Sequence, residues 1–360
     1  MRRARDAVLA PRVHACHHLG DAMTEQTGAL SRRSFLTTAT AAAGAATFGA
    51  PWVARAVGAK YTLRIATLAP QDSSWMRTFR AVGREIKQAT GGEVALKLYA
   101  GGVMGDEGAM VRKMRTGQLD GAAVTNVGLG DINKQLLMLQ LPLLFRNYKE
   151  LDRVRNAMAD TFAKLLYDSG FLLMGWGDVG PLYLFSNSPI ARPADIRATK
   201  MWVWDADPVS RTVMKVAGVN AIPLSVPDVL PSLQTGVVDA FANSPYGAIA
   251  LQWYTKAKYV TNLKLAMVIG GSVITRKAWE QLPPAHQAVM KQIADKHHGK
   301  LLRRIRADND AAVKTLTAKG ISVVQPKAFG EWKAIANKVR AEMTGSFFDP
   351  ALVNKMLSLL

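Results

Sequence analysis

Cysteine is almost absent from this sequence. The only one among 360 residues, Cys16, lies within the N-terminal 56 residues, ahead of the first predicted strand. The chain beyond that segment therefore has no disulfide and no thiolate, which excludes a cysteine nucleophile and thiolate metal sites. It also has no later run that is apolar enough over about 20 residues to cross a bilayer.

Motifs of common enzyme classes are absent as well. The sequence contains no GxSxG, no HExxH, no P-loop and no GxGxxG after a strand. Histidine is scarce beyond residue 56, where only His286, His297 and His298 occur. The last two are adjacent, so they point to different faces of a helix and do not ligate one metal together. We expect these histidines at the surface, and we predict no catalytic residue, no cofactor and no metal.

The N-terminal segment 31–56, SRRSFLTTATAAAGAATFGAPWVARA, combines three features of an export signal. Adjacent Arg32 and Arg33 precede a short apolar run rich in alanine, and Ala-Arg-Ala follows it. The paired arginines indicate the twin-arginine route. The apolar run is too short for a membrane anchor, and its Thr, Gly and Ala residues make it too weakly apolar. We expect residues 1–56 to be removed and the protein to act in the periplasm. Met23 lies at an ordinary distance before the arginine pair, which leaves the true start, Met1 or Met23, open.

Basic residues outnumber acidic ones by 46 to 27, a formal net charge of +19. The first 56 residues hold seven of the basic and three of the acidic residues, which leaves +15 on the remainder. Such a charge would suit nucleic acid, but export argues against that partner. The basic residues are also spread along the chain, apart from a cluster at Lys300, Arg303, Arg304 and Arg306 that we expect on a solvated helix face.

The pattern of apolar residues predicts an α/β protein. Strands are predicted at 61–66, 93–99, 122–126, 170–176, 182–186, 200–204, 238–242 and 272–275. Helices are predicted at 73–90, 107–116, 208–217, 227–235 and 284–318. About 300 residues suffice for two cores, and a helix over 284–318 is long enough to cross the whole molecule rather than one domain.

Polar and aromatic residues recur where predicted strands end, which is where open α/β sheets bind ligands. The candidates near such ends are Trp75, Asn126, Trp176, Trp202, Trp204, Asp205, Asn243 and Tyr246. Each tryptophan alone has core packing as the alternative role, because large aromatic side chains usually serve cores. Their repetition at one topological place favours a binding site.

Several segments together resemble the periplasmic solute receptors of tripartite ATP-independent periplasmic (TRAP) transporters, related to the C4-dicarboxylate receptor. The resemblance covers nearly all of residues 61–350. It rests on YTLRIATLAP, YAGGVMGDEGAMVRKMRTGQLDGA, LQLPLLFRN, PADIRATKMWVW and, most specifically, VNAIPLSVPDVLPSLQTGVVDAFANSP. Glu107, in the "G-D-E" segment, joins the binding candidates.

The resemblance implies two α/β lobes with mixed sheets, joined by crossover strands and a long spanning helix, in the type II periplasmic binding protein arrangement. Residues 61–180 plus 271–308 would form lobe I, and residues 181–270 plus 309–360 lobe II. A small-molecule solute would bind in the cleft between the lobes, and the TRAP membrane permease subunits would be the partner. The resemblance leaves monomer and homodimer open.

Two departures from the family pattern bear on the ligand. Most members hold a ligand carboxylate with the arginine of a "K-I-R" motif, whereas this chain reads Lys200-Met201-Trp202. A second common arginine, in "G-F-R", has no counterpart in the segment 180–183. Because the guanidinium fork matches two carboxylate oxygens, losing both weakens the expectation of a C4-dicarboxylate.

Trp202 and Trp204 instead offer flat faces that suit a ring, a sugar face or a cation. We predict Trp202 as a wall of the cleft and Asn243 as a hydrogen-bonding residue. Anion recognition through Arg64, Arg80, Lys200 or main-chain amides at helix starts stays open as an alternative.

The sequence thus predicts a periplasmic receptor that captures a small organic solute and does not transform it. An exported hydrolase or lyase on a two-lobe scaffold is the alternative, and it predicts a perturbed carboxylate pair in the cleft. A solute sensor for a membrane kinase is a third possibility.

Overall fold

The computed structural model of the chain describes residues 58–360. The predicted export signal at 31–56 lies outside the described residues. Within 58–360, no helix is both long and apolar enough to span a membrane.

The first sheet has five strands in the order β2-β1-β3-β10-β4. They are β1 (Tyr61–Thr67), β2 (Val94–Tyr99), β3 (Gly121–Thr125), β4 (Phe171–Pro181) and β10 (Met267–Thr275). Strand β1 runs parallel to β2 and β3, whereas β10 is antiparallel to both β3 and β4. Helices α1 (Ser74–Ala89) and α2 (Glu107–Arg115) connect the parallel strands, as the apolar spacing of the sequence predicts.

The second sheet has four strands in the order β11-β9-β5-β8. They are β5 (Tyr183–Ser186), β8 (Ala240–Asn243), β9 (Tyr259–Thr261) and β11 (Ser322–Val324). A parallel pair, β6 (Trp202–Trp204) and β7 (Ile222–Leu224), continues this sheet through a bridge between Met201 and Ala240. Its helices are α6 (Pro208–Ala217), α7 (Val226–Thr235) and α8 (Pro245–Ala250).

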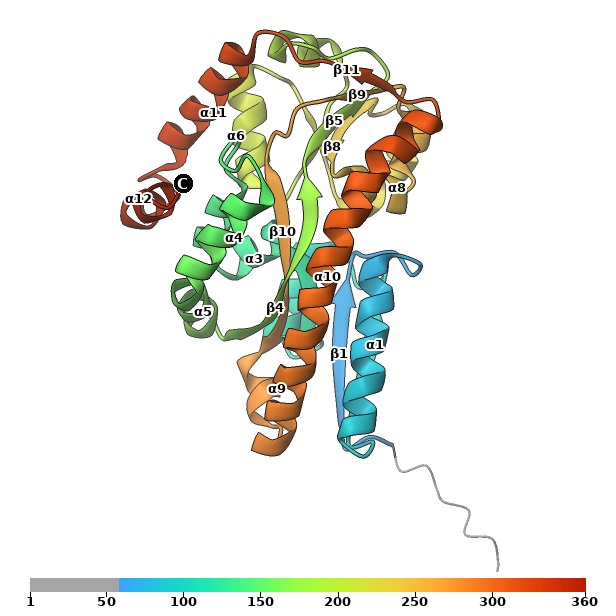
Figure 1. Cartoon of the computed structure of the whole chain (residues 1–360), viewed down its shortest axis with the longest axis vertical. Helices are drawn as coiled ribbons and strands as arrows, with labels where there is room; N and C mark the ends of the chain where they lie inside the picture. The colour runs from blue at the N-terminus through green and yellow to red at the C-terminus, as the bar shows by residue number, and fades with distance from the viewer. Residues whose placement is uncertain (1–57) are drawn as a thin grey trace, which may run out of the picture. The chain divides into compact units, whose positions relative to one another are not determined.

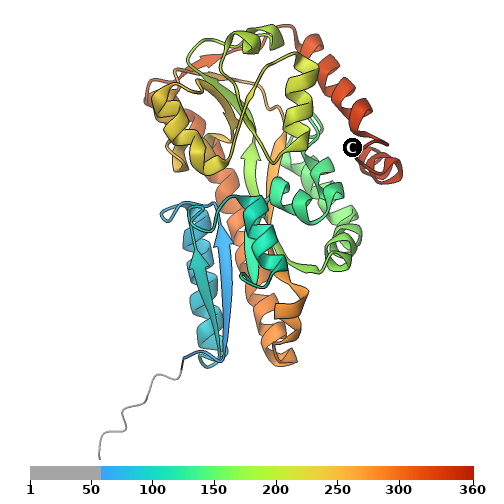
Figure 2. The ribbon, with the colours of Figure 1, turned by 180° about the vertical axis from the view of Figure 1, so that it is seen from behind.

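Two elements connect the sheets. Strand β4 leads into β5 with only Leu182 between them, so one chain segment passes from the first sheet to the second. Helix α10 (Pro284–Ala318) has 35 residues, a length of about 50 Å, and it contacts α1, β4 and α8. Figures 1 and 2 show α10 running beside β4 from one lobe to the other. The predicted fold, two α/β lobes with crossover strands and a spanning helix, is confirmed.

The region between β3 and β4 is helical, and sequence patterning gave no element there. It contains α3 (Asn126–Ile132), the 3-10 helix η1 (Lys134–Gln140), α4 (Tyr148–Ala157) and α5 (Ala159–Asp168). The remaining elements are η2 (Pro193–Ala198), η3 (Trp253–Lys256), α9 (Arg276–Glu280), α11 (Phe329–Met343) and α12 (Pro350–Leu357). Five consecutive buried residues of η1, Leu136 to Gln140, show no helical period, which explains why the apolar spacing did not reveal it.

The C-terminal end returns to the first sheet. Helix α11 packs on α6, but Val353 and Met356 of α12 lie in the same buried cluster as Val154 and Phe162 of α4 and α5. The predicted division places these two groups in different lobes. The lobe boundaries therefore stay a prediction. Helix α12, which that prediction assigns to lobe II, packs on helices of lobe I.

Candidate functional site

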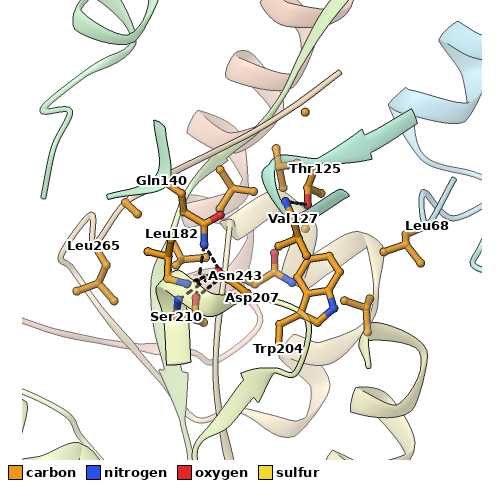
Figure 3. A pocket seen from close by; sticks show the side chains of 18 of the residues that line it. Leu68, Thr125, Val127, Gln140, Leu182, Trp204, Asp207, Ser210, Asn243 and Leu265 are labelled. Carbon is orange, nitrogen blue, oxygen red and sulfur yellow. Dashed lines mark hydrogen bonds between the residues drawn. The ribbon is translucent and has the colours of Figure 1, made fainter. Parts of the chain in front are cut away.

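A cavity of about 240 Å³ lies between the two sheets. Its walls come from the loop after β1, the end of β3, η1, strands β4 and β6, and helices α6 and α11. Figure 3 shows Leu68, Val127 and Trp204 on one side of it and Leu182 and Leu265 on the other. Both lobes thus contribute to one mostly apolar site.

Five of the nine predicted binding residues line this cavity. They are Trp75, Glu107, Trp202, Trp204 and Asn243. The four that do not are Asn126, Trp176, Asp205 and Tyr246. Ligand binding by the five lining residues stays a prediction, since no solute is present.

Trp202 is a buried wall of the cavity, with 6% of its surface exposed. Its indole N–H donates to the carbonyl of Leu224 at 3.0 Å, which ties β6 to β7. The ring packs edge-on against Trp253 at 5.1 Å between centroids and lies nearly parallel to Trp204 at 6.5 Å. The position at which the resembled receptors carry an arginine is thus part of an aromatic stack in the second lobe.

Trp204 and Asn243 are half-buried. Of the polar groups on these two side chains, only the amide nitrogen of Asn243 has no hydrogen-bond partner within residues 58–360. The Trp204 indole N–H donates to Asp106 Oδ2 at 2.8 Å, which joins β6 to the loop before α2. Asn243 Oδ1 accepts from the Ser244 amide at 2.8 Å, and its Nδ2 has no hydrogen-bond partner within residues 58–360. Figure 3 shows the Asn243 amide near the centre of the site.

Trp75 and Tyr246 link the two lobes. Their rings lie 4.9 Å apart, and the Tyr246 hydroxyl accepts from the Ser74 amide at 2.8 Å. The Trp75 indole N–H donates to the Asp178 carbonyl of β4 at 3.1 Å. Tyr246 therefore holds α8 against the start of α1. It does not line the cavity itself.

Glu107 is buried, and three donors surround its carboxyl group. Both the amide and the hydroxyl of Thr125 donate to it at 2.8 Å, and the Gly128 amide donates at 2.7 Å. Burial raises the pKa of Glu107 to about 8, and the three donors act in the opposite direction. Although Glu107 lines the cavity, both of its oxygens are used to join α2 to the start of α3.

Three other candidates have structural surroundings that explain their residue types. Asn126 is fully buried, and its Oδ1 accepts from the Ile269 amide at 3.0 Å, beside a β-bulge of β10. Trp176 lies within β4, not at its end, and packs edge-on against Phe162 at 5.9 Å. Asp205 is exposed to solvent after β6. The strand-end argument was wrong for Trp176, because β4 continues to Pro181 as a crossover strand.

A polar group that the sequence did not reveal lies on the cavity wall (Figure 3). Asp207 caps α6, its Oδ1 accepting from the amides of Val209 at 3.0 Å and Ser210 at 3.2 Å. Its Oδ2 accepts from the Ser210 hydroxyl and from Gln140 Nε2, both at 2.5 Å. Burial raises the pKa of Asp207. Asp207-Pro208 is a recognisable helix-start signal, but nothing in the sequence joins it to Gln140.

The expected surface position of the histidines is wrong for His298. This side chain is 6% exposed and lines the cavity. Its Nδ1 lies 2.7 Å from the Ala294 carbonyl and its Nε2 2.9 Å from the Ser272 hydroxyl. Burial lowers its pKa, so the ring stays neutral near pH 7. In residues 58–360 no cluster of histidine and acidic side chains is arranged to hold a metal ion.

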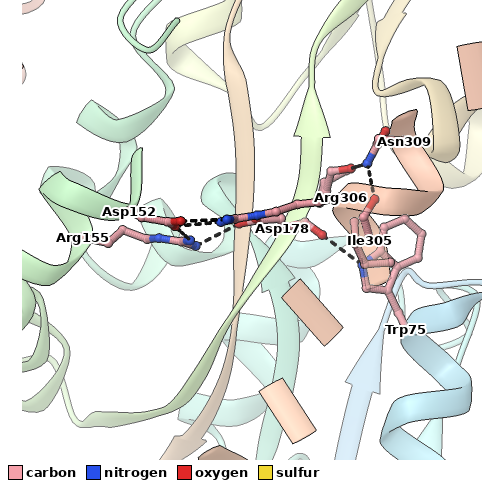
Figure 4. A network of polar contacts seen from close by, with 8 residues as sticks. Trp75, Asp152, Arg155, Asp178, Ile305, Arg306 and Asn309 are labelled. Carbon is pink, nitrogen blue, oxygen red and sulfur yellow. Dashed lines mark hydrogen bonds and ion pairs between the residues drawn. The ribbon is translucent and has the colours of Figure 1, made fainter. Parts of the chain in front are cut away.

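Arg306 is likewise not on a solvated face. Its Nε donates to Asp178 Oδ2 at 2.8 Å, and its terminal nitrogens donate to both oxygens of Asp152 at 2.7 Å. Arg155 completes the network from α4, donating to Asp178 at 2.8 Å and to Asp152 at 2.5 Å (Figure 4). Four charges therefore join α4, the crossover strand and the spanning helix next to the cavity.

The cations considered for anion binding are all elsewhere. Arg64 donates to Asp120 at 2.8 Å, Arg80 to Gln71 at 3.0 Å and Lys200 to the Gly236 carbonyl at 3.0 Å. None of the three lines the cavity. That alternative is therefore not supported for these side chains.

Known proteins resemble the chain in both sequence and fold. A solute-binding protein of Chromohalobacter salexigens is 24% identical over 61% of this chain and 66% of its own, about two thirds of that relative's length. The 2,3-diketo-L-gulonate-binding periplasmic protein of Escherichia coli is 24% identical over 71% of this chain and 78% of its own.

A TRAP periplasmic solute binding protein of Chromohalobacter salexigens, solved with bound D-glucuronate, has a TM-score of 0.78 to this structure at 19% identity. The superposition covers 83% of this chain and 100% of that one. The family model of the bacterial extracellular solute-binding proteins, family 7, matches residues 65–346. That match extends over both sheets and the spanning helix, and the chain belongs to this family.

Proposed function

We propose that this protein is the periplasmic solute receptor of a TRAP transporter. In this role it captures a small organic solute between its lobes and delivers it to the membrane permease. The observation that carries the proposal is the cavity of about 240 Å³, whose walls come from both lobes of a solute-binding fold. Membership of the extracellular solute-binding family supports it, as do the 2,3-diketo-L-gulonate-binding relative and the solved structure with bound D-glucuronate.

Closure of the lobes would couple binding to delivery. The contacts around Trp75 and Tyr246 join the start of α1 to α8, and Ser74 also donates to Asp308 of α10 at 2.7 Å. By the predicted division, the contacts of Tyr246 cross the junction that a hinge motion would use, whereas the contact between Ser74 and Asp308 lies within lobe I. A solute that touches both walls would bind the closed form more tightly and shift the population toward it.

The test is a thermal-shift screen of the purified protein against acids, sugars, polyols and aromatic compounds. A solute present at about 100 times its Kd stabilises the folded state by about 2.7 kcal/mol, so a rise in Tm of roughly 5 °C or more is expected for a true ligand. Recovery of that compound unchanged is expected of a receptor. Conversion of the compound to a product would contradict the proposal.

One observation favours the alternative of an exported hydrolase or lyase. Glu107 and Asp207 both line the cavity and are both buried, and burial raises both pKa values. Each carboxyl group, however, accepts hydrogen bonds through both oxygens at the start of a helix. Helix capping accounts for their positions without a reaction. If the protein were instead a solute sensor, we expect a gene for a membrane kinase beside its own gene, in the place of the permease genes.

Export by the twin-arginine route belongs to the same proposal. Replacing both arginines, Arg32→Lys with Arg33→Lys, is expected to block export, because the paired guanidinium groups are the distinguishing feature of that signal. Cell fractionation should then find the uncleaved precursor in the cytoplasm. The matched control, Arg2→Lys with Arg3→Lys, changes a pair ahead of Met23 and should leave export intact. Normal periplasmic levels of the first variant would contradict this route.

A further inference from the structure

One carboxylate joins the two lobes beside the cavity. Asp106 directly precedes α2, a helix that packs on β1, β3 and α3 of the first lobe. Its Oδ2 accepts from the indole N–H of Trp204, the last residue of β6, at 2.8 Å. The same oxygen accepts from the amide of Val226, the first residue of α7, at 3.3 Å. Both donors belong to elements of the second lobe, so a single oxygen atom joins α2 to two parts of the opposite lobe.

The two oxygens of Asp106 have separate partners. Oδ1 accepts from the Glu107 amide at 2.9 Å and caps α2, which leaves Oδ2 for the second lobe. Trp204 lines the cavity (Figure 3), and its indole N–H, the only polar group of its side chain, is the donor to Asp106. A side chain that a bound solute contacts is therefore also one that joins the lobes.

Apolar contacts join the lobes at the same place. Leu68, in the loop after β1, packs against a buried cluster that includes β1 and β3 and against another that includes β6 and β8. Gly102, in the loop before α2, has a φ of +76°, and a Cβ atom there would lie 3.2 Å from both Leu68 and Pro227 of α7. Because glycine has no Cβ atom, this loop approaches α7 more closely than most residues would allow.

Other polar contacts between the lobes lie beside segments that connect them. The Ser74 amide donates to the Tyr246 hydroxyl of α8, and the Ser74 hydroxyl donates to Asp308 of the spanning helix α10. An amide side chain at the end of η1 donates to the cap of α6, and the chain just after η1 donates to the segment between β9 and β10. Contacts beside a connecting segment move little when the lobes rotate about it. Asp106 precedes α2, which is no part of such a segment, so its contact is one that opening of the lobes has to break.

We propose that Asp106 is a positioning residue for solute capture, which holds the lobes closed over the cavity through Trp204 and Val226. The inference rests on the proposed receptor function. It assigns the closing contact to a residue that does not itself line the cavity. The fraction of closed molecules, and not the folding of either lobe, then depends on this carboxylate.

The experiment measures the distance between the lobes in the purified, solute-free protein by double electron–electron resonance. Nitroxide labels are attached to Gln118→Cys, just after α2, and to Gln234→Cys, in the last turn of α7, both at exposed positions. The only native cysteine is removed by Cys16→Ser, so that labelling is specific. The ratio of the short, closed distance to the longer, open distance is the readout.

Asp106→Asn is expected to lower the ratio of closed to open molecules about tenfold, the size of losing one hydrogen bond to a charged group. Asparagine keeps an oxygen for the Glu107 amide, but its N–H group then faces the indole N–H of Trp204, so two donors meet. The matched control is Asp349→Asn at the exposed cap of α12, where the carboxylate accepts from the Ala351 amide at 2.7 Å. The control should leave the ratio unchanged, and an equally unchanged ratio in Asp106→Asn would overturn the inference.

A second substitution tests the bond itself. Trp204→Phe keeps an aromatic ring on the wall and removes the N–H, so it should lower the ratio about fivefold on its own. In this background Asp106→Asn should lower the ratio by a further factor of only about two, because the longer bond to Val226 is all that remains to be lost. A tenfold loss in both backgrounds would show that Asp106 acts through another partner and would overturn the contact with Trp204.

The remaining outcomes separate closure from folding and from the receptor function. Asp106→Asn keeps the cap of α2, so its urea unfolding midpoint should match that of Asp349→Asn; a much lower midpoint would assign Asp106 to folding and overturn the inference. A parent protein without a closed population would overturn it as well. Each of these results leaves the receptor function standing, because that function is judged by binding and recovery of an unchanged solute in the thermal-shift screen.

Discussion

Asp178→Asn is expected to lower the free energy of unfolding by about 3–5 kcal/mol, the usual cost of removing one partner from a buried ion pair. Asp178 is 1% exposed and accepts from Arg155 and Arg306, each at 2.8 Å. Asparagine keeps the shape but leaves Asp152 alone to neutralise two guanidinium groups. Because the network joins α4, β4 and α10, the loss should loosen the connection between the lobes. Urea unfolding followed by circular dichroism measures it.

The matched control is Asp168→Asn. Asp168 forms an ion pair of 2.8 Å with Lys164, but both side chains are more than half exposed. Such surface pairs contribute little, so the free energy of unfolding should change by about 0.5 kcal/mol or less. If both variants lost similar amounts, the central role of the Asp178 network would be refuted.

Trp202→Ala is expected to lower the free energy of unfolding by about 3–5 kcal/mol, as buried large-to-small changes of aromatic residues do. The indole is 6% exposed, packs on Trp253 at 5.1 Å and donates to the Leu224 carbonyl. The residue in the position of the ligand-binding arginine would thus contribute to stability even without ligand. The measurement is again urea unfolding of the ligand-free protein.

Two variants separate packing from the hydrogen bond. Trp202→Phe keeps one aromatic ring but loses the second ring and the N–H that donates to Leu224, so we expect about 1 kcal/mol for the hydrogen bond plus the cost of the cavity that the second ring leaves. Trp204→Ala removes a half-buried indole and should destabilise the fold less than Trp202→Ala. A Trp202→Ala variant as stable as the parent chain would show that this ring is no part of the core.

The fold was predictable because its elements follow local patterns. The 3.6-residue period placed α10 at its observed bounds, 284–318, and the flanking glycines marked the first strands and helices. The α3 to η1 region was not predicted, since its residues are buried on several sides and carry no period. Strand β4, predicted at 170–176, continues through its glycines at 175, 177 and 180 to Pro181. Of these, Gly175 faces the His298 ring and Gly180 the Asn309 amide, each closer than a Cβ atom could stand.

Some residues of the candidate site could likewise be predicted from the sequence, and others could not. Trp204 and Asn243 are the last residues of β6 and β8, whose ends meet at the cavity, so sequence position sufficed to select them, whereas Trp202 lines the cavity from the first position of β6. Asn126 and Trp176 share that pattern but serve a bulge and a core, a difference that lies in their neighbours across the sheet. Gln140 and Asp207 are 67 residues apart, and only folding brings amide and carboxylate together.

By itself the sequence determined the α/β class, the long helix and the absence of thiol chemistry beyond residue 56, because composition and periodicity are properties of the chain, and its resemblance to the TRAP receptors implied the two lobes. It also fixed tryptophan in place of arginine at 202. Only the tertiary structure decided that no lysine or arginine within residues 58–360 lines the cavity and that Gln140 donates to Asp207. Those facts depend on distances between residues far apart in the chain, which a linear pattern does not contain.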